Sequence, residues 1–167
     1  MRRHTRFLLT TAALFLFTLG CVPAGAEHFD IFMSLRSASG VADSGWDTDP
    51  PEGGLHERQV VSARAGEDLV LEWRLRSEFP HGTMKEVGIR IFVAPEGAIG
   101  QKQLPAPSAP RVIDNSFTAD FLPQHSARGE VHFRVTEPGA YLVRLQSENT
   151  LNDQGHEHFA AVDLKVE

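Results

Sequence analysis

The chain has 167 residues and a formal net charge of −6 at neutral pH, a length that suits one domain with a full hydrophobic core. The acidic balance argues against nucleic acids and anionic membrane surfaces as partners, since both are bound through basic patches. Its single cysteine excludes an internal disulfide and a cluster of thiolate metal ligands.

The N-terminal segment has the pattern of a secretory signal peptide. Three arginines precede a short apolar run over residues 7–19, and Ala24-Gly25-Ala26 supplies small residues at the cleavage positions. The run is shorter than the roughly 20 apolar residues of a membrane span. We therefore expect cleavage after Ala26, which makes residues 1–26 a signal peptide and residues 27–167 a single exported domain.

Cys21 offers a second processing route, because bacterial lipoproteins are cut just before a lipidated cysteine. Gly20 fits that pattern, but Thr18 stands where a larger aliphatic residue is usual. We expect the soluble form, in the periplasm or outside the cell, and keep a lipid anchor at Cys21 as the alternative. The signal peptide holds three arginines and no acidic residue, so its removal leaves 13 basic and 22 acidic residues and a net charge of −9.

From residue 28 onward, short segments with period-two alternation are separated by turn signals. The expected strands lie over residues 28–35, 58–64, 69–76, 87–93, 111–121, 130–135, 140–147 and 156–166. Two segments rich in Gly, Pro and polar residues, 37–57 and 94–110, are expected to be long surface loops. Trp46 is expected to pin the first of these loops to the domain.

About seven or eight short strands without helical periodicity predict an all-β fold. The spacing of turns favours a two-sheet antiparallel β-sandwich with immunoglobulin-like Greek-key connections. Tyr141 follows Pro138-Gly139, where such sandwiches often place a corner tyrosine. No later apolar run is long enough to span a membrane.

Most histidines are expected at one end of this sandwich. In the standard strand order, the start of the first strand and three of the interstrand loops share an end. That end would hold the histidines at five positions and one methionine: His28, His81, Met84, His125, His156 and His158. His156 and His158 begin the last strand and, by alternation, point the same way as its core residues.

Imidazole groups suit copper and zinc, and a thioether favours copper. His81, His156 and His158 are therefore candidate metal ligands. Further candidates at the same end are His28, Met84 and His125. The competing interpretation is structural, because a histidine at the rim of a strand often donates to a backbone carbonyl.

Recognisable catalytic motifs are missing from the sequence, although Ser and Thr are plentiful. It has no Gly-x-Ser-x-Gly motif, no mature cysteine and no defensible carboxylate pair. We therefore expect a non-enzymatic binding or accessory domain of the cell envelope, with an envelope protein as partner. A candidate patch for it comprises the outward residues Arg74, Arg76, Arg90 and Phe92. The alternative function is that of a copper or zinc carrier using the histidines.

Overall fold

The computed structural model describes residues 29–47, 58–77, 84–106, 108–122, 125–148 and 158–167. Within these ranges the chain forms nine strands: β1 (Phe29–Ser37), β2 (Gly40–Asp47), β3 (Val60–Ala63), β4 (Asp68–Ser77), β5 (Met84–Glu96), β6 (Ile113–Phe121), β7 (Ser126–Arg134), β8 (Gly139–Glu148) and β9 (Phe159–Val166). In the same ranges we find no helix of the length and apolar character that crossing a membrane requires.

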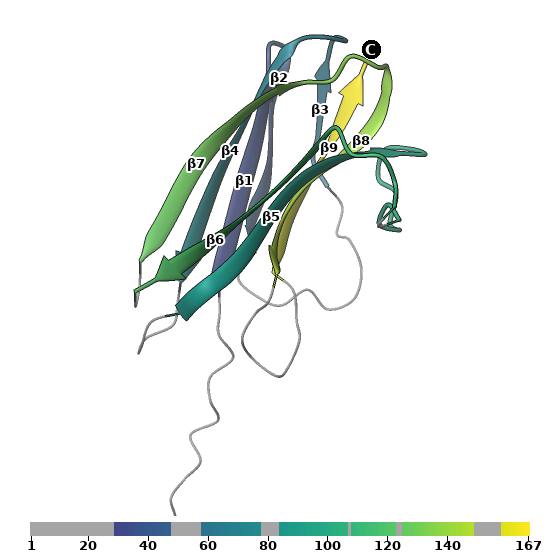
Figure 1. Ribbon diagram of the computed structural model, residues 1–167. Coiled ribbons are helices and arrows are strands. Elements are labelled where there is room, and N and C mark those ends of the chain that lie inside the picture. Colours follow the sequence, from purple (N-terminus) through teal and green to yellow (C-terminus); the bar gives the residue numbers. More distant parts are fainter. Residues whose placement is uncertain (1–28, 48–57, 78–83, 107, 123–124, 149–157) are drawn as a thin grey trace, which may run out of the picture.

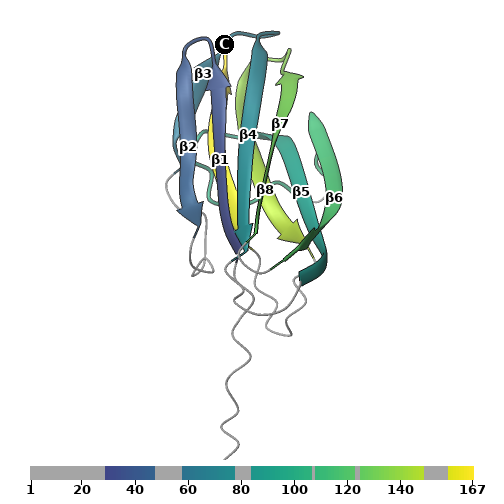
Figure 2. The ribbon, with the colours of Figure 1, turned by 90° about the vertical axis from the view of Figure 1, so that its left-hand side faces the viewer.

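The strands form two sheets that face each other (Figures 1 and 2). The four-stranded sheet has the order β2-β1-β4-β7, and the five-stranded sheet has the order β3-β9-β8-β5-β6. Neighbouring strands are antiparallel except β3 and β9, which pair in parallel. The expected all-β, immunoglobulin-like sandwich is confirmed.

The residues that the sequence alternation predicted to point inward form the hydrophobic core between the two sheets. Along β5, the inward residues are at most 2% exposed: Val87, Ile89, Ile91 and Val93. On the facing sheet, β1 contributes Ile31, Met33 and Leu35, each fully buried. Burial of side chains of this size stabilises a fold by about 1.5–3 kcal/mol each. The strands are therefore held in two layers by their inward faces.

Tyr141 forms the predicted corner. Its hydroxyl donates a hydrogen bond of 2.7 Å to the carbonyl oxygen of Glu137, four residues upstream. Gly139 lies between them with φ +156°, a conformation that glycine adopts readily. Burial, followed by the charge of Glu137, raises the pKa of the Tyr141 phenol, because both disfavour the phenolate.

The first expected loop is partly a strand. Residues 40–47 form β2, which pairs with β1 at the edge of the four-stranded sheet. Ala42 alone in β2 belongs to the core cluster, so this strand lacks the apolar alternation by which we recognised the others. Trp46 lies in β2 opposite Phe32 and is 43% exposed, so it does not pin a loop as expected. Residues 48–57 lie outside the described ranges.

The second expected loop begins later than predicted, because β5 extends to Glu96. The described residues between Gly97 and Val112 form no strand. The following strand, β6, pairs with β5 at the edge of the five-stranded sheet. In the standard constant-type immunoglobulin order the fourth strand joins the other sheet, so β6 departs from the expected order. The parallel pairing of β3 with β9 is a further departure from the expected antiparallel sandwich.

Candidate functional site

The strand ends that flank the predicted metal ligands meet at one end of the sandwich. Register pairs Phe29 with Ser77 in the four-stranded sheet, and Gln146 with Phe159 in the five-stranded sheet. Figure 1 shows these strand ends opposite the end that carries the C-terminus. The strand order therefore agrees with the expectation that these connections share an end.

Three of the predicted ligands, His28, His81 and His156, lie outside the described residues. Met84 is the first residue of β5 and pairs in register with Phe121 at this end. The approach of these side chains to one another stays a prediction.

His125 and His158 are described, and their surroundings differ. His125 is exposed, and its backbone N–H donates to the Leu122 carbonyl at 3.1 Å. His158 is fully buried, and its backbone N–H donates to the Ser147 hydroxyl at 3.1 Å. Among the described residues, no three His, Cys, Asp or Glu side chains are grouped as metal ligands.

The outer face of the four-stranded sheet carries a row of aromatic rings and cations, in which Phe32 is half-buried and the other three side chains are exposed. Its members are opposite one another in register on successive strands: Trp46 on β2, Phe32 on β1, Arg74 on β4 and Arg128 on β7. We call these four residues the cross-strand row. The ring centroids of Phe32 and Trp46 are 5.4 Å apart, and the Arg74 guanidinium carbon is 5.6 Å from the Phe32 centroid.

A buried carboxylate fixes the arginine beside this row. The Arg76 Nε–H donates to Asp30 Oδ2 at 2.8 Å, and the Asp30 side chain is fully buried. The Arg76 guanidinium carbon lies 5.3 Å from the Trp46 ring centroid. Asp30 thereby orients a cation against the indole, which restricts the position of Trp46 on the sheet.

The sequence-predicted patch of Arg74, Arg76, Arg90 and Phe92 does not form one surface. The first two lie on β4 and the last two on β5, so they belong to different sheets. Phe92 is only 5% exposed, and the Arg111 guanidinium carbon lies 4.2 Å from its ring centroid. Arg90 pairs with Asp114 at 2.7 Å. Alternation correctly placed all four side chains outward, but it could not assign strands to sheets.

The outer face of the five-stranded sheet carries a buried ionic cluster. Arg58 donates through Nε to Asp163 and through Nη2 to Glu96, the latter at 3.0 Å. The three side chains are at most 4% exposed. The second Asp163 oxygen accepts the Gly100 N–H at 2.6 Å. This arrangement links β9, the end of β5 and the segment after it.

Burial within this cluster strongly perturbs the pKa of one carboxyl. Burial raises the pKa of Glu96 to about 7, with Asp163 adding to the rise and Arg58 opposing it. One cation faces two carboxylates, so a protonated Glu96 leaves the cluster neutral. A perturbed carboxyl of this kind marks a functional-site candidate only where a ligand reaches it, and Glu96 has no exposed side-chain surface. The cluster is a structural link.

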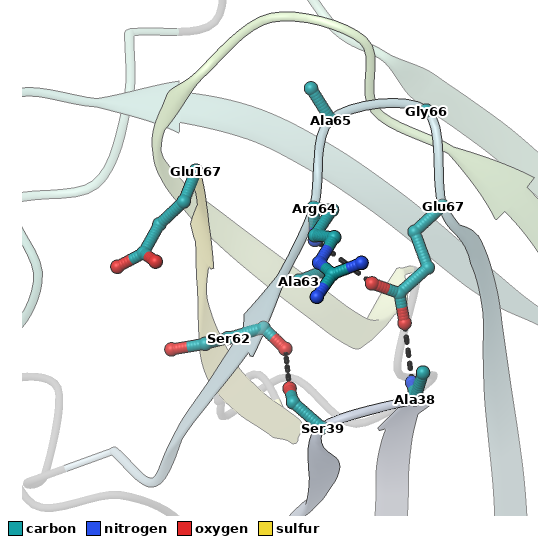
Figure 3. A pocket seen from close by; sticks show the side chains of 9 residues that line it. All are labelled: Ala38, Ser39, Ser62, Ala63, Arg64, Ala65, Gly66, Glu67 and Glu167. Carbon is teal, nitrogen blue, oxygen red and sulfur yellow. Dashed lines mark hydrogen bonds between the residues drawn. The ribbon is translucent and has the colours of Figure 1, made fainter.

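A pocket of about 600 Å³ lies at the opposite end of the sandwich (Figure 3). The Glu67 carboxylate crosses it, accepting the N–H groups of Arg64 at 2.9 Å and of Ala38. These donors lower the pKa of Glu67. The Ser39 hydroxyl donates to the Ser62 carbonyl oxygen. These polar groups join the β1–β2 turn to the β3–β4 region and are engaged in structural contacts.

No protein-family model and no curated protein matches the chain. Among solved structures, similar backbones include the CARDB domain of a Pyrococcus furiosus protein, with 14% identity, a TM-score of 0.45, and coverage of 84% of this chain and 96% of that one. The PmoD soluble domain from a Methylocystis species has 10% identity, a TM-score of 0.43, and coverage of 82% and 90%.

The catalytic domain of an LPMO from Listeria monocytogenes has 20% identity and a TM-score of 0.39. The alignment covers 64% of this chain and 59% of that one. Identities and TM-scores in this range assign no function to the chain.

Proposed function

We propose that this chain is an exported, non-enzymatic domain of the periplasm or cell envelope that binds a partner through the outer face of its four-stranded sheet. The observation that carries the proposal is the cross-strand row, in which Trp46 is 43% exposed and both arginines are exposed. Exposed aromatic and arginine side chains are enriched where proteins bind partners. The basic and apolar start of the sequence supports export, with cleavage after Ala26 and a lipid anchor at Cys21 as the alternative.

The test compares two triple variants. Each variant removes two positive charges and one exposed apolar side chain. The row variant carries Trp46→Ala, Arg74→Gln and Arg128→Gln. The control variant carries Leu104→Ala, Lys85→Gln and Lys102→Gln, at exposed positions away from the row.

Retention of the purified chain on immobilised envelope fractions is the measurement. We expect the wild type and the control variant to be retained and the row variant to be lost. Equal retention of both variants would show that binding does not use this face. Mass spectrometry of the exported chain, starting at Glu27 or lipidated at Cys21, tests the processing route.

A second candidate is copper or zinc binding at the histidine end. It is favoured by the convergence of strand ends where His158 is buried. Titration with Cu(I), Cu(II) and Zn(II) should give one-to-one binding that is lost in a His81→Ala, His156→Ala variant. The affinity should fall as the pH drops through about 6.5, because protonated imidazole does not ligate. Absence of binding by the folded chain would return these histidines to a structural role.

A further inference from the structure

Two arginines of the cross-strand row face each other, and the part of the chain that the structure describes supplies no acidic partner for either. Register places Arg74 directly opposite Arg128, and like charges in that position destabilise a sheet. Within the described ranges, neither guanidinium lies within salt-bridge distance of a carboxylate. Other cations on the same face are paired, such as Arg134 with Asp68 at 2.5 Å and Arg36 with Glu72 at 3.1 Å. The row therefore leaves a local excess of positive charge on a chain whose net charge is −6.

This local positive charge is suited to binding planar anions. A guanidinium presents parallel N–H donors that pair with a carboxylate through two hydrogen bonds. Adjacent strands are about 4.8 Å apart, so the two opposed arginines extend from neighbouring backbone positions, and their long side chains can reach one carboxylate together or two in succession. A carboxylate bound there also relieves the repulsion between Arg74 and Arg128.

The other half of the row is aromatic and continues in the same line. The rings of Trp46 and Phe32 are inclined by 38° and lie beside the arginines. The whole row crosses four strands, about 14 Å at the usual strand spacing. A ligand that lies along it must therefore present flat apolar faces at one part and carboxylates at another.

We infer that the partner of this face is an acidic polysaccharide, a chain of sugar rings that carry carboxylate groups. The inference rests on the proposed binding role of the face and names its ligand. The C–H face of a sugar ring stacks on an indole or phenyl ring, and its carboxylate reaches the adjacent guanidinium groups. A peptide of acidic residues supplies carboxylates on flexible side chains but no rigid ring face, so it pays more conformational entropy for fewer contacts.

Calorimetric titration of the folded chain with matched polymers tests this ligand class. The probes are polygalacturonate, its methyl ester, alginate and poly-glutamate. We expect binding to polygalacturonate or alginate. We expect binding at least about tenfold weaker to the methyl ester, which keeps the rings and loses the charge, and to poly-glutamate, which keeps the charge and loses the rings.

Two variants separate the parts of the row. Arg74→Gln with Arg128→Gln, and separately Trp46→Ala, should each weaken binding of the acidic polysaccharide by about tenfold or more. Lys85→Gln with Lys102→Gln is the charge-matched control and should leave the affinity unchanged. Thermal unfolding of each variant confirms that it is folded.

The outcomes distinguish the ligand class from the binding role. Tight binding of poly-glutamate, or an unchanged affinity in Trp46→Ala, would overturn the polysaccharide inference and leave an acidic protein as partner. Failure of both polysaccharides to bind, while the row variant still loses retention on envelope fractions, would overturn the ligand class alone. If that retention is also insensitive to the row, the proposed function fails with it.

Discussion

The two sheets of this sandwich present different outer faces. On the five-stranded sheet, outward side chains form a small second core: Phe92, Ala94, Leu142 and Ala161, none more than 8% exposed. On the four-stranded sheet, the outward side chains include Val41, which is 61% exposed, and the cross-strand row. The same period-two alternation therefore produces a covered face on one sheet and an open face on the other.

The difference arises from the segment that follows β5. Gly100 donates its N–H to Asp163, and Arg111 lies over the ring of Phe92, so this segment crosses the outer face of the five-stranded sheet. Among the described residues, no segment outside the sheet makes a contact of this kind over the cross-strand row. On the covered face, charged outward side chains such as Asp163 are buried in structural contacts, whereas on the other sheet the outward side chains of Arg74 and Arg128 are exposed.

Asp163→Ala should lower the free energy of unfolding the most, because it removes one carboxylate of the buried ionic cluster on the outer face of the five-stranded sheet. The substitution leaves Arg58 buried with one partner fewer and frees the Gly100 N–H. Removal of one member of a buried ion pair typically costs about 3–5 kcal/mol. Urea unfolding measures the loss, and Lys165→Ala on the same side of β9 is the exposed control. A loss no larger than that of the control would contradict the structural role of the cluster.

Gly129→Ala tests how tightly side chains pack on the inner face of the four-stranded sheet. A Cβ atom at this position would lie 2.5 Å from Cζ2 of Trp73, so either the indole or β7 must move. Overpacking of this kind costs about 1–3 kcal/mol. The expected decrease in the free energy of unfolding is restored at least in part by the additional substitution Trp73→Phe, which is smaller. An undiminished stability in Gly129→Ala alone would mean that the inner packing beneath the open face is loose.

Glu96→Gln tests whether the buried ionic cluster makes the stability of the protein depend on pH. The folded state raises the pKa of Glu96 from its ordinary value of 4.5 to about 7, so it binds more protons than the unfolded state between these values. The contribution of this group is therefore fully present below about pH 4.5 and is lost as the pH rises through about 7.

Glutamine imitates the protonated form and should remove this dependence. Relative to the wild type, we expect Glu96→Gln to raise the free energy of unfolding at pH 8 by on the order of 1 kcal/mol and to change it little at pH 5. Denaturant titrations at several pH values from 5 to 8 measure the slope, with Glu86→Gln at an exposed position as control. An identical pH slope in the variant and the wild type would exclude Glu96 as the titrating group.

Arg128→Gln should have the smallest effect on stability, since it lies on the open face. It removes the like charge opposite Arg74, so the free energy of unfolding should stay within about 0.5 kcal/mol of the wild-type value or rise slightly. Arg134→Gln on the same strand loses its pairing with Asp68 and should lower stability instead. A clear destabilisation by Arg128→Gln would reveal a stabilising contact of this side chain.

Much of the fold was predictable from the sequence, because the strands that line the core show a period-two alternation of apolar residues. The inward residues of β4, β5 and β8 alternate strictly, and Tyr141 follows a Pro-Gly turn. The edge strand β2 was missed because it contributes only Ala42 to the core. Its pairing with β1 is a backbone interaction, which leaves little trace in side-chain hydrophobicity.

The candidate sites were harder to predict, because their residues meet only after folding. Arg58 and Asp163 are 105 positions apart, and alternation alone gives Asp163 the appearance of a solvent-facing residue. A usable signal was the unexpected presence of Phe92, Ala94 and Leu142 at outward positions, which indicates a covered face. The cross-strand row draws on four strands, so its recognition requires the register that the structure supplies. The histidine ligands remain a prediction.

The cross-strand row also has a practical consequence, because the chain contains two tryptophans and they lie in contrasting places. Trp46 is exposed on the open face, whereas Trp73 is half-buried and packs against the core, with its ring centroid 5.3 Å from that of Phe117. Indole fluorescence depends on contact with water, so a ligand on the open face should shift the emission of Trp46 to shorter wavelength while unfolding shifts that of Trp73 to longer wavelength. The protein therefore carries one intrinsic optical reporter for occupancy and another for integrity, and Trp46→Phe separates their signals.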